Sequence, residues 1–116
     1  MSIDLTASQA LGLWHTVALG QIRADSRDLT LRQMAILLHV YLKPPPHTVR
    51  GLAATLGVTK PVITRALDTM GAMGLVDRVR DDLDRRSVVV KRTVGGALYL
   101  EKFGDLIIAE GRGLRL

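Results

Sequence analysis

Residues 48–73 read TVRGLAATLGVTKPVITRALDTMGAM, and their capping, glycine and apolar positions are the strongest indication of the fold. Thr48 can cap a short helix that runs from Val49 to Leu56, because its side-chain oxygen can accept a backbone N–H of the first turn. Gly57 follows, and glycine is the residue that most readily takes the left-handed conformation at a helix end. The pattern therefore predicts a short helix closed at both ends.

A second helix is predicted from Thr59 to about Met73. Thr59 is again a capping residue type, and Pro61 falls in the first turn, where its missing N–H costs nothing. Gly74 stands in the terminating position. Two such helices, packed around the turn between them, form a helix-turn-helix. The apolar residues expected in that contact are Leu52, Ala53 and Leu56 on the first helix, and Val58, Ile63, Ala66, Leu67 and Met70 after it.

The remaining face of the second helix is left for solvent or a ligand, and its chemistry suits the major groove of DNA. Arg65 can donate two parallel hydrogen bonds to a guanine edge, or it can hold a phosphate. Lys60 stands at the helix N-terminus, where backbone N–H groups and the helix dipole favour a phosphate. Val62 offers apolar contact to a thymine methyl group, although surface valines are common without such a role. The candidate DNA-contacting residues of this helix are Thr59, Lys60, Pro61, Val62, Thr64 and Arg65, and Asp68 shares their face.

A hairpin is predicted after the second helix. The segments 75–80 and 87–92 show valine-rich alternation, which favours strands, and the polar turn 81–86 joins them. Arg85 and Arg86 at the hairpin tip can reach a minor groove or its phosphates. The three aspartates of the turn have two interpretations, which the residues alone do not separate. Either one of Asp81, Asp82 and Asp84 pairs with an arginine, for example Arg65 or Arg78, and directs it, or all three belong to a solvated turn.

Three further helices flank these elements. One is predicted from about Ser8 to Arg23, and another follows Thr30, which forms a capping box with Gln33. Three successive prolines end that second flanking helix. A last helix begins after Thr93, and its glycines make it intrinsically weak unless it packs against something. The apolar stripe of the helix after Thr30 is Met34, Leu37, Leu38 and Tyr41.

The first and last helices are broadly apolar and need cover on more than one side, which predicts an interface between two copies of the chain. The fold class is therefore mainly α with a small β-hairpin (α+β), a winged helix-turn-helix with N- and C-terminal dimerisation helices. We expect a single domain over 1–116, with a DNA-binding core at 30–93 and dimerisation helices at 5–24 and 94–112. The candidate dimerisation residues are Leu11, Trp14, Ala18, Leu98, Phe103, Leu106 and Ile107.

The amino-acid composition limits the kinds of partner and cofactor that the chain can bind. The 116 residues include no cysteine, which excludes disulfides, zinc–thiolate sites and thiol redox sensing. The stretch 47–93 holds nine lysines and arginines against five aspartates, which is +4 of the formal net charge of +5. A polyanionic partner is one explanation, and an ordinary solvated surface is the other. No apolar run approaches the length of a membrane span and no targeting signal is visible, so we expect a cytoplasmic chain without a membrane partner.

The sequence does not favour an enzyme. His15, His39 and His47 fall on separate segments, and no carboxylates cluster around them. His39 on an apolar helix is expected to be a core or interface histidine rather than a ligand. No phosphate-cradling glycine loop is present, because residues 71–74 are better explained as a helix end. We therefore expect no cofactor and no metal.

Residues 29–96 resemble the MarR (multiple-antibiotic-resistance regulator) family. The resemblance covers more than half of the chain, with motifs in the correct order and spacing. They are Leu29-Thr30 with Gln33, residues 52–60 (LAATLGVTK) through the turn, 62–68 (VITRALD), 74–78 (GLVDR), the hairpin turn 81–86 (DDLDRR), Val90, and 93–96.

This resemblance implies a bacterial-type homodimer on a near-palindromic site, with recognition helices in successive major grooves and dimerisation through the first and last helices. The function it implies is that of a sequence-specific double-stranded DNA-binding transcription regulator, which we expect to be a repressor. The chain is shorter than is usual for the family, at both ends. The missing length falls in the dimer helices, so the resemblance does not extend to the pocket where family members often bind phenolic or other aromatic effectors, and the sequence names no effector.

Two alternatives stay open. Winged helices also serve as protein-interaction adaptors, because function depends on the site and not on the fold. A sequence-tolerant architectural DNA-binding protein would use the same basic surface without discriminating among sites.

Overall fold

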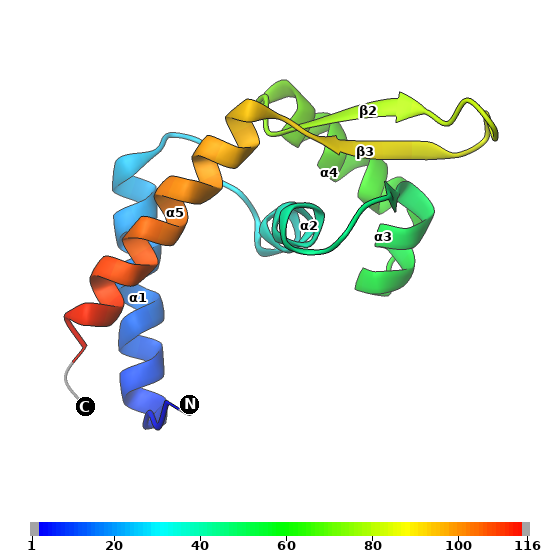
Figure 1. Cartoon of the computed structure of the whole chain (residues 1–116). Coiled ribbons are helices and arrows are strands. Elements are labelled where there is room, and N and C mark those ends of the chain that lie inside the picture. Colours follow the sequence, from blue (N-terminus) through cyan, green and yellow to red (C-terminus); the bar gives the residue numbers. More distant parts are fainter. Residues whose placement is uncertain (1–2, 115–116) are drawn as a thin grey trace. The chain divides into compact units, whose positions relative to one another are not determined.

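The computed structural model describes residues 3–114, and the chain divides into two compact units (Figure 1). One unit is residues 29–100, and the other joins the segment up to Asp28 with the segment from Glu101 onward. The helices are α1 (Ala7–Ala24), α2 (Leu31–Leu42), α3 (Val49–Leu56), α4 (Lys60–Ala72) and α5 (Val94–Arg112), and the strands are β1 (His47–Thr48), β2 (Val76–Arg80) and β3 (Val88–Arg92).

The core of unit 29–100 lies between α2, α3, α4 and the sheet. All eight residues expected at the contact of α3 with α4 belong to it or pack against it, which confirms the predicted helix pair. Gly57 ends α3 with a φ of 68°, in the left-handed region where a side chain is unfavourable. On α2 the buried residues differ from the predicted apolar stripe, because α2 is covered on more than one side. Its fully buried residues are Ile36, Leu37 and Val40, while Met34 and Tyr41 are partly buried.

The expected hairpin is part of a three-stranded antiparallel sheet in the order β1-β3-β2. β2 and β3 are the two predicted strands, with Val76 opposite Arg92. β1 was not predicted, because two residues carry no alternation that a sequence pattern can detect. Its His47 pairs with Val90 of β3. The His47 ring is buried and lies edge-on to the half-buried ring of His39, with 5.3 Å between the ring centroids.

Tyr41 joins α2 to the end of the sheet and the start of α5. Its hydroxyl accepts the backbone N–H of Thr93 at 2.8 Å and lies 3.1 Å from the carbonyl oxygen of Leu75. The Thr93 side chain donates to the carbonyl of Gly74 and accepts the N–H of Gly96. Gly96 is buried at this junction, where a Cβ atom would overlap the Tyr41 hydroxyl and the Leu75 carbonyl oxygen. A glycine is therefore required at position 96 for steric reasons.

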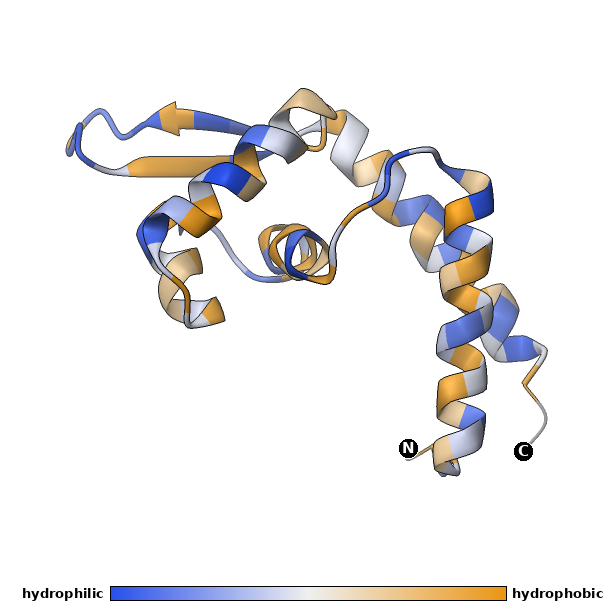
Figure 2. Ribbon diagram, turned by 180° about the vertical axis from the view of Figure 1, so that it is seen from behind, coloured by the Kyte–Doolittle hydropathy of each residue, from blue (hydrophilic) through white to orange (hydrophobic). Residues whose placement is uncertain are grey.

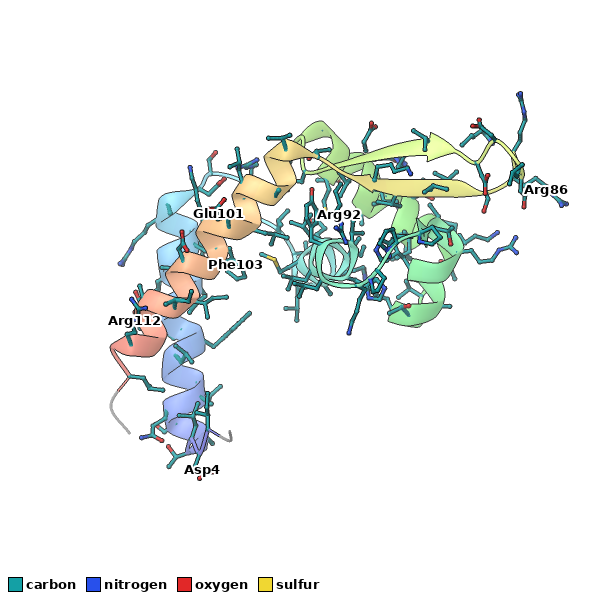
Figure 3. The ribbon with its side chains drawn as sticks, in the orientation of Figure 1. Asp4, Arg86, Arg92, Glu101, Phe103 and Arg112 are labelled. Atoms are coloured by element: carbon teal, nitrogen blue, oxygen red, sulfur yellow. The ribbon has the colours of Figure 1, made fainter. Side chains whose placement is uncertain are left out.

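Arg92 at the end of β3 caps the C-terminus of α2. Its guanidinium donates to the carbonyl oxygens of Val40 (2.9 Å) and Lys43 (3.0 Å), and it stands 5.8 Å from the centre of the Tyr41 ring. A cation at the C-terminal end of a helix satisfies unpaired carbonyls and the helix dipole. Figure 3 labels Arg92 beside α2. This side chain therefore stabilises the fold, although it belongs to the basic stretch 47–93.

In the other unit, α1 begins with a capping box between Thr6 and Gln9, which starts the helix one residue before the predicted boundary. Gly20 of α1 faces the Leu106 side chain of α5 so closely that a Cβ there would lie 2.8 Å from a leucine methyl carbon. After α1, Arg27 donates side-chain and backbone hydrogen bonds to Asp25, and these lower the pKa of that carboxyl to about 2. The Asp25–Arg27 pair thereby stabilises the loop after α1 at neutral pH.

Candidate nucleic-acid interface

The first two turns of α4 present polar and cationic side chains to solvent. Lys60, Pro61, Thr64 and Arg65 are exposed and line a shallow, open hollow on the surface. Val62, between them in sequence, is half-buried and so offers less area to a ligand than the sequence suggested. The helix surface left over from core packing is therefore the one predicted to face DNA.

The N-terminus of α4 differs from those of the other capped helices. Thr59 occupies the predicted N-cap position with extended dihedrals, but its side chain makes no capping hydrogen bond. Its carbonyl oxygen accepts the N–H groups of Val62 and Ile63 instead. The Thr59 hydroxyl is thus not committed to the helix, and it lies where the helix dipole attracts an anion.

Asp68 of α4 and Arg78 of β2 form an ion pair with 2.6 Å between oxygen and nitrogen. This contact ties the recognition helix to the hairpin. It also corrects one detail of the pairing interpretation, because the carboxylate beside Arg78 comes from the helix and not from the turn, whereas the arginine beside a turn aspartate is Arg86. Among residues 3–114, Arg65 takes part in no ion pair, so its guanidinium has no carboxylate partner to displace.

The turn 81–86 is held by its own aspartates. Asp81 accepts the N–H of Leu83 at 2.9 Å, and Asp84 accepts the N–H of Arg86 at 3.1 Å. The backbone of Ser87 closes the turn by bonding to Asp81 and to Asp84. Two of the three acids therefore shape the turn, as the solvated-turn interpretation expected, and Asp84 also lies 3.5 Å from the Arg86 guanidinium.

The lysines and arginines of residues 47–93 fall into two groups, those bonded within the fold and those exposed to solvent and able to bind a ligand. Arg78 is paired with Asp68, Arg92 caps α2, and Arg80 donates to the carbonyl oxygen of Arg85 at 2.6 Å. Charge counting could not separate these from the rest, because each partner is distant in sequence or is a backbone oxygen. The exposed lysines and arginines left over are Arg50, Lys60, Arg65, Arg85, Arg86 and Lys91, and of these Arg86 lies 3.5 Å from the Asp84 carboxylate while remaining exposed. Arg86 lies at the far end of the hairpin (Figure 3).

A comparison with known protein families identifies the family of this helix-turn-helix and hairpin. Residues 27–87, more than half of the 116, match the model of the MarR family. The chain belongs to the MarR family. The matched segment contains α2, β1, α3, α4, β2 and the whole turn 81–86, so it includes every candidate DNA-contacting residue.

Solved structures agree with this MarR-family fold. The chain is similar to S. aureus MepR in a complex with DNA, with 20% identity, a TM-score of 0.78 and coverage of 91% of this chain and 85% of MepR. A transcriptional regulator from Thermotoga maritima has 24% identity and a TM-score of 0.68, covering 86% and 70% of the two chains. PcaV from Streptomyces coelicolor, crystallised with its natural ligand, has 23% identity, a TM-score of 0.65 and coverage of 97% and 81%. The fold is that of the MarR-family transcription regulators.

The candidate dimerisation residues of this MarR-family chain differ in how much surface they offer. On α1, Leu11 and Trp14 are 70% and 55% exposed, and Ala18 is half-buried. On α5, Leu98 and Ile107 are exposed, whereas Phe103 is only 7% exposed and Leu106 is half-buried. Hydrophobic residues recur along the whole of α1 (Figure 2). Phe103 and Leu106 therefore have less area to give to a second copy than Leu11 and Trp14.

Two other kinds of feature are absent from the described residues. Within 3–114, no group of three or more histidine, aspartate or glutamate side chains is arranged to hold a metal ion. No helix in the described part of the chain is both long and apolar enough to cross a membrane.

Proposed function

We propose that this MarR-family chain is a sequence-specific double-stranded DNA-binding transcription regulator that acts as a homodimer on a near-palindromic site. The observation that carries the proposal is the exposed face of α4. There Lys60 and Arg65 have no ion-pair partner among the described residues, and the Thr64 hydroxyl is exposed beside them. A protein surface that keeps cations and donors unpaired is suited to a ligand that supplies anions and acceptors, as DNA does.

The roles of the α4 residues follow from their chemistry. Arg65 reads a guanine through two parallel hydrogen bonds, and Thr64 bonds a base or a phosphate. Thr59 and Lys60 at the helix N-terminus hold a phosphate and so set the register of the helix in the groove. Pro61 and the half-buried Val62 contact thymine methyl groups.

The hairpin supplies the second contact. Arg85 and Arg86 are exposed at its tip, and the Asp68–Arg78 ion pair links the hairpin to α4. An arginine at a narrow minor groove meets a strongly negative potential. We therefore assign Arg85 and Arg86 to the groove or phosphates next to the major groove occupied by α4. Support comes from MepR, whose structure is described as a complex with DNA.

We propose that the chain represses transcription from the promoter to which it binds. Occupying a promoter requires only DNA binding, whereas activation requires an additional contact to the transcription machinery. A promoter–reporter assay with and without the chain measures directly whether the chain lowers or raises transcription. Activation would contradict this part of the proposal.

Binding to duplex DNA should be sequence-dependent and should weaken steeply with salt. Selection from random duplexes, followed by sequencing, is expected to return two inverted half-sites about one helical turn apart.

On the selected site, Lys60→Ala should reduce the slope of log K against log salt by about 1 for each phosphate that is no longer neutralised, so by about 2 in a dimer. Arg32→Ala is the charge-matched control, because Arg32 is exposed on α2 outside the site, and it should leave the slope unchanged. Binding to neither duplex nor single-stranded DNA at low salt would favour the adaptor alternative, and binding without sequence preference would favour an architectural protein.

The homodimer is proposed to form through residues 5–24 and 94–112. Trp14→Glu should convert the chain to a monomer at tens of micromolar, because a carboxylate in an apolar interface has to be desolvated without a partner. Light scattering measures the mass of each species. Leu42→Glu is the matched control, since Leu42 is also apolar and 73% exposed but lies on α2. A wild-type chain that is monomeric at that concentration would contradict the dimer and the paired half-sites.

A further inference from the structure

Leu83 is exposed at the tip of the hairpin. It is 98% exposed, which is more than any other large apolar side chain among the described residues. Single exposed leucines are common, so exposure alone carries little weight. The turn does not require a leucine here, because the hydrogen bonds that shape it use the Asp81 and Asp84 carboxylates and the backbone. Leu83 contributes only its backbone N–H to the turn.

The turn holds Leu83 in a defined place. Its N–H is bonded to Asp81, the N–H of Arg86 is bonded to Asp84, and two backbone bonds of Ser87 close the base of the turn. The Arg80 guanidinium donates to the carbonyl of Arg85 across the turn. A side chain on such a cross-linked tip has less backbone freedom to lose when it enters a binding site.

The charge of the tip indicates what kind of contact it can make. Residues 80–86 contain three arginines and three aspartates, so the segment is formally neutral. Figure 2 shows the hairpin turn as mostly hydrophilic. In the sequence, Leu83 is the one aliphatic residue of this segment. With no net charge, the segment as a whole releases few counterions from DNA beyond those that Arg85 and Arg86 displace where they touch the backbone. Burial of apolar surface by Leu83 is a separate contribution that this tip can add.

We propose that Leu83 inserts from the minor groove between two base pairs as an apolar wedge, opening the step and bending the duplex. This inference rests on the proposed function. Apolar side chains that enter the minor groove in this way partly unstack a step and kink the duplex toward the major groove. Pyrimidine–purine steps are the easiest to unstack, so Leu83 adds a preference for TA or CA/TG beneath each hairpin tip. Arg85 and Arg86 hold the backbone on either side of the opened step.

The test uses the full chain on its selected site, with 2-aminopurine in place of adenine at the step beneath the tip. Wild-type binding should raise the 2-aminopurine fluorescence several-fold, because unstacking relieves quenching. End-to-end energy transfer between dyes on the duplex should report a bend of tens of degrees. Leu83→Ala should abolish the fluorescence rise and most of the bend, and Leu83→Met should retain both. Leu42→Ala is the matched control, an exposed leucine on α2, and it should behave as wild type.

The outcomes separate the two proposals. Wild-type binding with no change in fluorescence or bend, or equal changes with Leu83→Ala, would overturn the wedge and leave the proposed function standing. Absence of sequence-specific duplex binding by the wild type would overturn the proposed function, and the wedge with it. Leu83→Ala removes only a 98% exposed side chain, so its melting temperature should match wild type and loss of folding is not an alternative explanation.

Discussion

Arg65→Ala removes most of the chain's discrimination between its selected site and random duplex while leaving its affinity for random duplex within a few-fold. The reason is that the Arg65 guanidinium is exposed and has no ion-pair partner in the described structure, so it is free to make both hydrogen bonds to one guanine. A bidentate base contact is worth about 1–3 kcal/mol of discrimination. Two half-sites double this to about 2–6 kcal/mol, or roughly 30-fold and upward.

The measurement is a competition titration of selected against scrambled duplex at one fixed salt concentration. Arg65→Lys is the informative companion, because lysine keeps the charge but cannot form the planar pair of hydrogen bonds. It should retain affinity for random duplex and lose discrimination almost as fully as alanine. If Arg65→Lys discriminates as well as wild type, Arg65 holds a phosphate and base reading lies elsewhere on α4.

Gly96→Ala should cost about 3 kcal/mol or more in the free energy of unfolding, since overpacking typically costs about 1–3 kcal/mol and a buried polar group left without its partner costs about 1–3 kcal/mol more. An added Cβ overlaps two groups that cannot move independently, the Tyr41 hydroxyl and the Leu75 carbonyl oxygen. Relieving the overlap separates Tyr41 from the N–H of Thr93, which it accepts at 2.8 Å.

Denaturant unfolding followed by circular dichroism measures this cost, and the same helix provides the control. Gly104 also lies in α5, but nothing comes within 4 Å of a Cβ placed there. Gly104→Ala should therefore stabilise the chain by about 0.5–1 kcal/mol, the usual gain from replacing an interior helical glycine. Similar effects of the two substitutions would show that position 96 is not sterically restricted.

The helix pair and its exposed face could be predicted because the deciding signals are local. Thr48, Gly57 and Pro61 mark helix ends by their own backbone preferences. The apolar spacing of Ile63, Ala66, Leu67 and Met70 leaves only one face of α4 for a ligand. Fold class and the α4 candidates follow from these residues without any knowledge of distant contacts.

Which polar groups stabilise the fold could not be predicted from local sequence patterns. The pairing of His47 with Val90, of Asp68 with Arg78, and of Arg92 with the end of α2 each joins residues at least ten positions apart. Such contacts depend on how finished elements meet in space, which no periodicity encodes. Residues 48–73 carry enough local signal to predict two helices around a turn, with a cationic face left exposed. That Arg78, Arg80 and Arg92 are already engaged, and that Arg65 has no ion-pair partner among the described residues, depends on which groups come close together after folding.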